Sequence, residues 1–117
     1  MTLSQPTGDE LVEMLAALSN PLRLRILATL AGGRDYVSHL ARVIGVSRPL
    51  LHMHLQRLEA VGLIVGNLEL SADGKAMKFY QVSDFALTLT PETLARAAKT
   101  LTDPGPETGS MRKETAS

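Results

Sequence analysis

The chain of 117 residues contains no cysteine and no tryptophan, and only 3% of its residues are aromatic. Without cysteine it can form neither a disulfide framework nor a thiolate metal site, which fits a reducing compartment, and we expect a cytoplasmic protein. No run of about 18 apolar residues is present, so we expect no membrane-spanning helix. The N-terminus also lacks the basic start and apolar run of a secretion signal.

The sequence lacks the motifs that mark common enzyme sites. It has no glycine-rich phosphate loop and no nucleophile elbow. Ser38 and His39 are neighbours, but no acidic residue is placed convincingly to orient the histidine. We therefore expect no enzymatic activity.

The formal net charge is zero, and the charges are unevenly distributed. Residues 21–60 contain six arginines and all three histidines, against two acidic residues. The first twenty residues contain three acidic residues and no basic one. A neutral chain with a basic middle fits a protein that binds a polyanion through one face.

The pattern of apolar residues and helix caps predicts helices and one hairpin in the order helix-helix-helix-helix-hairpin-helix. This order is that of a winged helix-turn-helix, a mainly α fold with a β-hairpin wing (α+β). The expected helices span residues 9–18, 21–30, 38–44, 47–61 and 90–100, and the expected strands span residues 63–70 and 75–82.

The segment from Gly45 to Gly62 is the most informative part of the chain. Ser47 is placed to cap a helix, and Leu51, Leu55 and Leu58 recur at a spacing that turns one stripe toward a core. A helix that served only stability would be expected to carry Glu and Lys on its other face. That face instead carries Arg48, His52, Met53 and Gln56. We interpret the segment as the recognition helix of a helix-turn-helix.

Ten residues are predicted to contact DNA. An arginine fork can bind a guanine edge or a phosphate, apolar side chains can touch thymine methyl groups, and lysines at a hairpin can meet phosphates or a minor groove. For each residue the alternative is an ordinary solvated side chain, and Arg57 could also pair with Glu59. The predicted residues are Ser47, Arg48, Pro49, Leu50, His52, Met53, Gln56, Arg57, Lys75 and Lys78.

Other polar residues favour structural roles. His54 lies beside the apolar stripe and points away from His52, so a packed, hydrogen-bonded histidine is favoured over a metal ligand. Of Arg23 and Arg25 we expect one to support the fold and the other to face solvent or DNA.

Asp35 and His39 are weak candidates for a metal site. They are four residues apart at the start of a helix and could converge on one ion. Two ligands are too few for a metal site, however, because a site needs three or four. We therefore favour a capping role for Asp35 and a solvated His39.

Four segments resemble the ArsR (SmtB/ArsR) family of bacterial transcriptional regulators. Residues 18–27, with Pro21, Arg23 and the pair Ile26-Leu27, resemble the second-helix signature of that family. Residues 39–47 resemble its positioning helix and turn, residues 47–64 its recognition helix, and residues 74–82 its wing. The resemblance covers roughly residues 10–100.

The resemblance implies a homodimer, built from the first and last helices, that represses transcription until a metal ion or another signal releases it. The chain departs from the two best-known metal sites of the family. Tyr36-Val37-Ser38-His39 stands where a Cys-x-Cys motif would lie, and residues 90–100 contain no histidine. No cofactor is evident, and a role for a transition metal such as Ni or Zn stays open.

Helical spacing indicates the residues of the dimer interface. Apolar stripes on the first and last helices are better explained by an interface between subunits than by a cofactor pocket. The predicted interface residues are Leu11, Met14, Leu15, Leu18, Leu94, Ala98 and Leu101.

These observations predict a flexible lead-in (residues 1–8), a winged helix-turn-helix domain for DNA binding and dimerisation (residues 9–102), and a disordered tail (residues 103–117). We expect a sequence-specific DNA-binding regulator, a homodimeric repressor on an inverted-repeat operator in double-stranded DNA. The alternative is a winged-helix protein-interaction module, or a regulator that needs a partner protein or a metal-loaded co-regulator.

Overall fold

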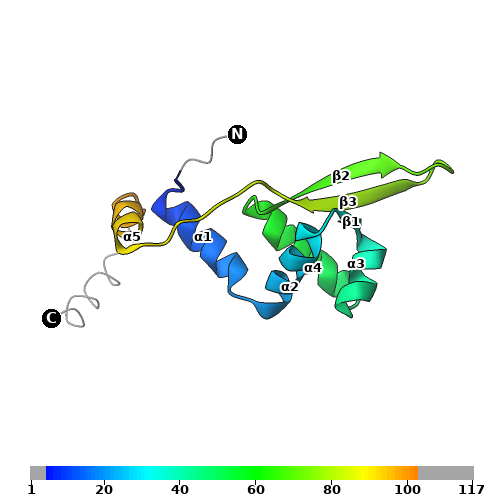
Figure 1. The fold of residues 1–117 in the computed structure, drawn as a ribbon, viewed down its shortest axis with the longest axis horizontal. Helices are drawn as coiled ribbons and strands as arrows, with labels where there is room; N and C mark the ends of the chain where they lie inside the picture. Colours follow the sequence, from blue (N-terminus) through cyan, green and yellow to red (C-terminus); the bar gives the residue numbers. More distant parts are fainter. Residues whose placement is uncertain (1–4, 103–117) are drawn as a thin grey trace. The chain divides into compact units, whose positions relative to one another are not determined.

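The structure is a computed structural model that describes residues 5–102 (Figure 1). Its helices and hairpin follow the predicted order, which confirms the predicted fold class. A short strand before the third helix was not predicted. The elements are α1 (Gly8–Leu18), α2 (Pro21–Ala31), β1 (Asp35–Tyr36), α3 (Val37–Ile44), α4 (Arg48–Ala60), β2 (Ile64–Leu70), β3 (Ala76–Val82) and α5 (Pro91–Ala98).

The chain forms two compact units. One consists of residues 13–86, and the other joins residues 5–12 to residues 87–102. The predicted tail, residues 103–117, and the first half of the predicted lead-in lie outside the described residues. Among residues 5–102, no helix has the length and apolar character needed to cross a bilayer.

The core of the larger unit is built almost entirely from aliphatic side chains. Leu51, Leu55 and Leu58 are fully buried, which confirms the predicted inward stripe of α4. Each leucine buried in this way contributes about 1.5–3 kcal/mol through the hydrophobic effect. Tyr80 is the one aromatic residue in the buried cluster. The cluster contains Ala17, Ile26, Leu27, Leu30, Leu40, Ala41, Leu51, Leu55, Leu58, Leu63, Ile64 and Tyr80.

The predicted caps of α2 and α5 are confirmed by their hydrogen bonds. The side chain of Asn20 accepts hydrogen bonds from the backbone N–H groups of Leu22 (2.9 Å) and Arg23 (3.2 Å), which would otherwise lack a partner. At α5, Thr90 and Thr93 form a reciprocal capping box. Each cap precedes a proline in the first turn, where the missing N–H has no cost.

The three strands form an antiparallel sheet in the order β1-β3-β2. Strand β2 pairs with β3 from Ile64 opposite Val82 to Leu70 opposite Ala76. Figure 1 shows this pair as a long ribbon that extends beyond α3 and α4. Strand β1 adds only two residues, with Tyr36 opposite Phe79, and is too short to give a periodic signal in the sequence.

The smaller unit contains hydrogen bonds between the start of α1 and the residues that follow α5. The backbone N–H of Gly8 donates to Thr100 Oγ1 at 2.7 Å. The backbone N–H of Thr102 donates to Asp9 Oδ1 at 3.1 Å, and the Thr102 hydroxyl donates to the same carboxylate. These bonds favour the charged carboxylate and lower the pKa of Asp9.

Candidate nucleic-acid interface

A tight turn between α3 and α4 sets the direction of the predicted recognition helix. Gly45 ends α3 with a positive φ of 87°, a conformation that glycine adopts without steric cost. The N–H groups of Gly45 and Val46 both donate to the carbonyl of Ala41, at 2.8 and 3.1 Å. Ser47 then caps α4 by accepting from the N–H of Leu50 at 3.2 Å. The predicted cap and turn are confirmed.

The inner face of α4 is fixed by a polar contact as well as by its leucines. The guanidinium Nε of Arg23 donates to His54 Nδ1 at 3.0 Å, and its Nη1 donates to the carbonyl of Ala17 at 3.3 Å. Burial, and secondarily the charge of Arg23, lower the pKa of His54, so the ring is held neutral. The packed, hydrogen-bonded His54 is confirmed. Arg23 is the arginine that supports the fold, and Arg25 is exposed.

The outer face of α4 is open along its whole length. Residues Arg48, His52 and Gln56 recur every four positions and therefore lie in one row. The ion pairs of the described residues do not include one between Arg57 and Glu59, so that alternative is not supported. All eight residues predicted in this region are exposed: Ser47, Arg48, Pro49, Leu50, His52, Met53, Gln56 and Arg57.

The structure brings Arg48 of α4 and Lys78 of β3 to one open hollow of about 270 Å³. The two residues are separated by thirty positions in the sequence, and both were predicted to contact DNA. The hollow is also lined by Tyr36, Val37, Ser38 and Met77, so the N-terminal turn of α3 forms part of its wall. An arginine of α4 and a lysine of β3 therefore line the same hollow.

Lys78 owes its position to a glycine on the facing strand. Its ammonium group lies 5.4 Å from the centre of the Tyr80 ring, within the range of a cation–π contact. Gly66 pairs with Tyr80 across the ladder. A Cβ atom at Gly66 would come within 2.8 Å of both Lys78 Cε and Tyr80 Cε1. The absence of a side chain at this position leaves the space that Lys78 occupies.

The tip of the hairpin holds Lys75 on an ordered turn. The backbone N–H of Lys75 donates to Ser71 Oγ at 3.1 Å and to Asp73 Oδ1 at 3.4 Å, while its side chain is exposed. Hydrogen bonds from Ser71 and Lys75 lower the pKa of Asp73, which therefore stays charged beside the lysine. The tip thus carries one charge of each sign.

Sequence analysis missed a group of residues that joins the wing to the segment before α3. Arg34 forms an ion pair with Glu69 of β2, and its guanidinium carbon lies 4.5 Å from the centre of the Phe79 ring. The Phe79 ring also meets Tyr36 edge to face, with 5.5 Å between ring centres. The pKa of Glu69 is lowered by this arginine. These contacts connect the hairpin to the segment before α3. They also pair the positive charge of Arg34 with a carboxylate of the protein.

Two leucines on the wing have no core to pack against. Leu68 and Leu70 share a strand face with Ile64, since side chains alternate along β2. Ile64 is fully buried, but Leu68 is 71% exposed and Leu70 is 75% exposed. The buried face of the sheet therefore ends partway along the hairpin, and its outer half is an apolar surface in solvent.

The candidate metal pair makes a different contact from the one expected. Asp35 Oδ2 lies 2.6 Å from His39 Nδ1, and Asp35 Oδ1 accepts from the N–H of Tyr36. The expectation that Asp35 caps α3 was wrong, because the N-cap residue is Tyr36 and no side chain caps the helix there. Among residues 5–102, no three His, Cys, Asp or Glu side chains are grouped to hold a metal ion.

The residues predicted for the dimer interface fall into two sets. Leu11 is buried in the single chain, and Met14 and Leu18 pack against its core. Leu15 is partly buried. The three predicted residues of the last helix and its end, Leu94, Ala98 and Leu101, are exposed. Their part in dimer formation stays a prediction.

Comparisons with known proteins agree with this geometry. Residues 18–67 match the model of a helix-turn-helix domain. The chain is 31% identical to an HTH-type transcriptional regulator of Methanocaldococcus jannaschii, over 74% of this chain and 90% of that protein. This match to a transcriptional regulator covers most of both chains and links the geometry to gene regulation.

Two solved structures share the fold. One is the homodimeric winged helix-turn-helix DNA-binding domain of a possible ArsR-family regulator from Mycobacterium bovis, with a TM-score of 0.57 and 28% identity over 63% of this chain and 64% of that one. The other is an ArsR-like regulator from Rhodococcus sp. RHA1, with a TM-score of 0.55 and 26% identity over 92% of this chain and 87% of that one. Together with the match of residues 18–67 to the helix-turn-helix model, these relatives show that the chain belongs to the ArsR family of winged helix-turn-helix transcriptional regulators.

Proposed function

We propose that this regulator is a cytoplasmic, homodimeric repressor that binds an inverted repeat in double-stranded DNA. The observation that carries the proposal is the shared hollow at which α4 and the wing present Arg48 and Lys78 together. A row of exposed polar side chains continues from Arg48 along α4. The hollow lined by the two cations suits a phosphate of the DNA backbone, and the row of polar side chains beside it suits the edges of the bases.

In this arrangement the two elements have different tasks. Helix α4 enters the major groove, where Arg48, His52 and Gln56 offer hydrogen-bonding groups to base edges. Lys78 and Lys75 neutralise phosphates beside the groove, and their contribution to affinity depends on salt and little on sequence. Leu50 and Met53 are exposed apolar side chains that suit contact with thymine methyl groups.

The dimer is supported by exposed apolar residues on and beside α5 and by the homodimeric relative. Leu94 is 45% exposed and Leu101 is 42% exposed, and a second copy would cover them. In a two-fold dimer the two recognition helices bind half-sites about 34 Å, or a multiple of it, apart. An inverted repeat with that spacing is the expected operator.

A DNA titration tests this function directly. Purified full-length protein is titrated by fluorescence anisotropy against DNA from upstream of its own gene and against a shuffled duplex of equal composition. We expect preference for the upstream DNA by about 10³-fold or more, and a steep loss of affinity between about 50 and 200 mM salt. Light scattering should give the mass of two chains. A monomer, or equal affinity for both duplexes, contradicts the proposal.

The alternative of a regulator that acts with a partner protein is favoured by one observation, the exposed Leu68 and Leu70 on the wing. It predicts that the pure protein binds DNA weakly and without sequence preference. It also predicts that Leu68→Ser leaves this weak binding unchanged while abolishing repression of a reporter gene in cells. Loss of repression only in variants that also lose DNA affinity would contradict this alternative.

A further inference from the structure

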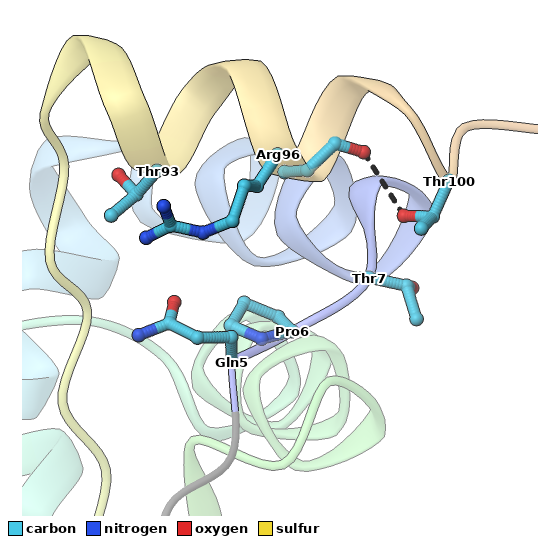
Figure 2. A pocket seen from close by; sticks show the side chains of 7 residues that line it. Gln5, Pro6, Thr7, Thr93, Arg96 and Thr100 are labelled. Atoms are coloured by element: carbon cyan, nitrogen blue, oxygen red, sulfur yellow. Dashed lines mark hydrogen bonds between the residues drawn. The ribbon is translucent and has the colours of Figure 1, made fainter.

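A hollow of about 310 Å³ lies in the smaller unit, and none of the predicted DNA contacts lines it. It is formed where one stripe of α5 and the residues that follow it faces the segment before α1 (Figure 2). A volume near 300 Å³ is at the lower end of the range for small-molecule sites. The lining residues are Gln5, Pro6, Thr7, Thr93, Arg96, Ala97 and Thr100.

The threonine hydroxyls that line the hollow already have partners within the chain. Thr93 Oγ1 donates to the carbonyl of Thr88 at 2.7 Å. Thr100 Oγ1 accepts from Gly8 and donates to the carbonyl of Ala97, the latter at 3.0 Å (Figure 2). Thr7 Oγ1 accepts from the N–H of Glu10 at 3.1 Å. These bonds hold the threonine hydroxyls in place around the hollow.

Two polar groups at the hollow have no such partner among residues 5–102. The hydrogen bonds and ion pairs of the described residues include none for the guanidinium of Arg96 or for the side-chain amide of Gln5. Figure 2 shows the two groups on the same side of the hollow, between α5 and Pro6. Glu10, in the first turn of α1, accepts a hydrogen bond from the N–H of Thr7 at 2.9 Å.

This combination selects a ligand by its chemistry. A guanidinium fork binds a carboxylate through two parallel hydrogen bonds, and an amide NH₂ can donate to the same oxygen. Apart from Arg96, Gln5 and the threonines, the hollow is lined by the apolar residues Pro6 and Ala97. One cation beside an apolar wall suits a monoanion with a short hydrocarbon or aromatic tail, and suits a multiply charged phosphate less well.

We propose that this hollow is a binding site for a small apolar monocarboxylate, with its carboxylate on Arg96 and Gln5 and its tail against Pro6 and Ala97. The site lies between the segment that leads into α1 and the helix proposed to form the dimer interface. Occupancy therefore changes the affinity for operator DNA. This second step rests on the proposed function, whereas carboxylate binding itself does not.

Binding is tested on the full chain by following backbone amide resonances during titration with benzoate. We expect saturable shifts at residues 5–7 and 93–100, with a dissociation constant at or below about 1 mM. Benzamide has the same shape without the charge and should bind at least about tenfold more weakly. Inorganic phosphate, as the second anion, should not compete at equal concentration.

Matched variants separate the site from general anion binding. Arg96→Gln should weaken benzoate binding about tenfold or more, and Arg96→Lys, which keeps the charge without the fork, should be intermediate. Lys99→Gln removes an exposed cation from the end of the same helix, outside the hollow, and should change nothing. Equal thermal midpoints show that all three variants fold. No saturable binding, equal binding of benzamide, or no effect of Arg96→Gln overturns the site.

The effect on DNA is measured by repeating the operator titration with saturating benzoate. The affinity of the wild type should change while that of Arg96→Gln does not, and operator DNA should change benzoate affinity by the same factor, as linkage requires. Benzoate binding with unchanged DNA affinity rejects the regulatory step. No sequence-specific DNA binding under any condition contradicts the proposed function instead, and leaves the result for the carboxylate site standing.

Discussion

Helix α4 and the β2–β3 wing are both predicted to touch DNA, but the protein holds them in different ways. The helix is fixed by three fully buried leucines and by the bond from Arg23 to His54. The outer half of the wing is held by its own ladder and by the exposed ion pair of Arg34 with Glu69, and it leaves Leu68 and Leu70 in solvent. Because an isolated two-stranded ribbon is only marginally stable, its end is the less rigid of the two. A rigid element can discriminate between bases, whereas a mobile one contributes mainly charge.

The largest effect should come from comparing the same change in the two elements. Leu55→Ala leaves a cavity in the core and should lower the free energy of unfolding by about 2–5 kcal/mol. Leu68→Ala removes the same atoms from an exposed position and should change it by no more than about 0.5 kcal/mol. Urea denaturation of both variants measures the free energy of unfolding. Similar losses would show that the wing is packed as firmly as the helix.

The second effect concerns DNA affinity at α4. Arg48→Ala should cost about 1–3 kcal/mol of binding free energy and relax the preference at one base pair, if the side chain reads a base. Competition with operators that carry single substitutions shows which position is relaxed. Lys99→Ala, a change of the same charge on the smaller unit, is the control. Unchanged affinity for Arg48→Ala would remove this residue from the interface.

A smaller and less selective change is expected at the wing. Lys75→Ala should weaken binding to operator and shuffled DNA alike, and should make the slope of log affinity against log salt shallower by about 1. The measurement is a salt series on both duplexes. A loss confined to the operator would mean that the wing reads sequence, contrary to the comparison drawn above.

The smallest effect should be a pH dependence of stability that comes from His54 of α4. The pKa of His54 is lowered from its ordinary 6.5 in the folded protein, so below that pH the unfolded chain binds the proton more readily. The free energy of unfolding should therefore fall as the pH drops below about 6.5. His54→Gln keeps an acceptor for Arg23 but does not titrate, and should show a shallower fall. The same slope in both proteins would exclude His54 as the cause.

Much of the fold could be predicted because local signals agreed with one another. The caps at Asn20, Ser47 and Thr90 and the leucine stripe of α4 each require only neighbouring residues. Strand β1 was not predicted, because two residues are too few to show an alternating pattern. The strand also forms only by pairing with β3, more than forty positions later in the sequence. Arg34 escaped for the same reason, since its partners Glu69 and Phe79 are remote in sequence.

The candidate site divides in a similar way. The exposed row on α4 follows from helical spacing, and so does the buried His54. Arg48 and Lys78 line one hollow because of the path that the hairpin takes past α3. No local sequence pattern predicts that path. Between Arg23 and Arg25, two positions apart, only the three-dimensional contact to His54 decided which one supports the fold. The contacts of the predicted residues with DNA and with a second subunit stay predictions.

The glycine opposite Tyr80 has a consequence for how this regulator can change over time. Adding one methyl group at position 66 would press on Lys78 and on a core aromatic ring together. Such a variant would alter both the stability of the fold and the orientation of a cation, although the altered residue itself touches no nucleotide. A genetic screen for weakened repression should therefore recover changes at this uncharged position alongside those in the arginines and lysines.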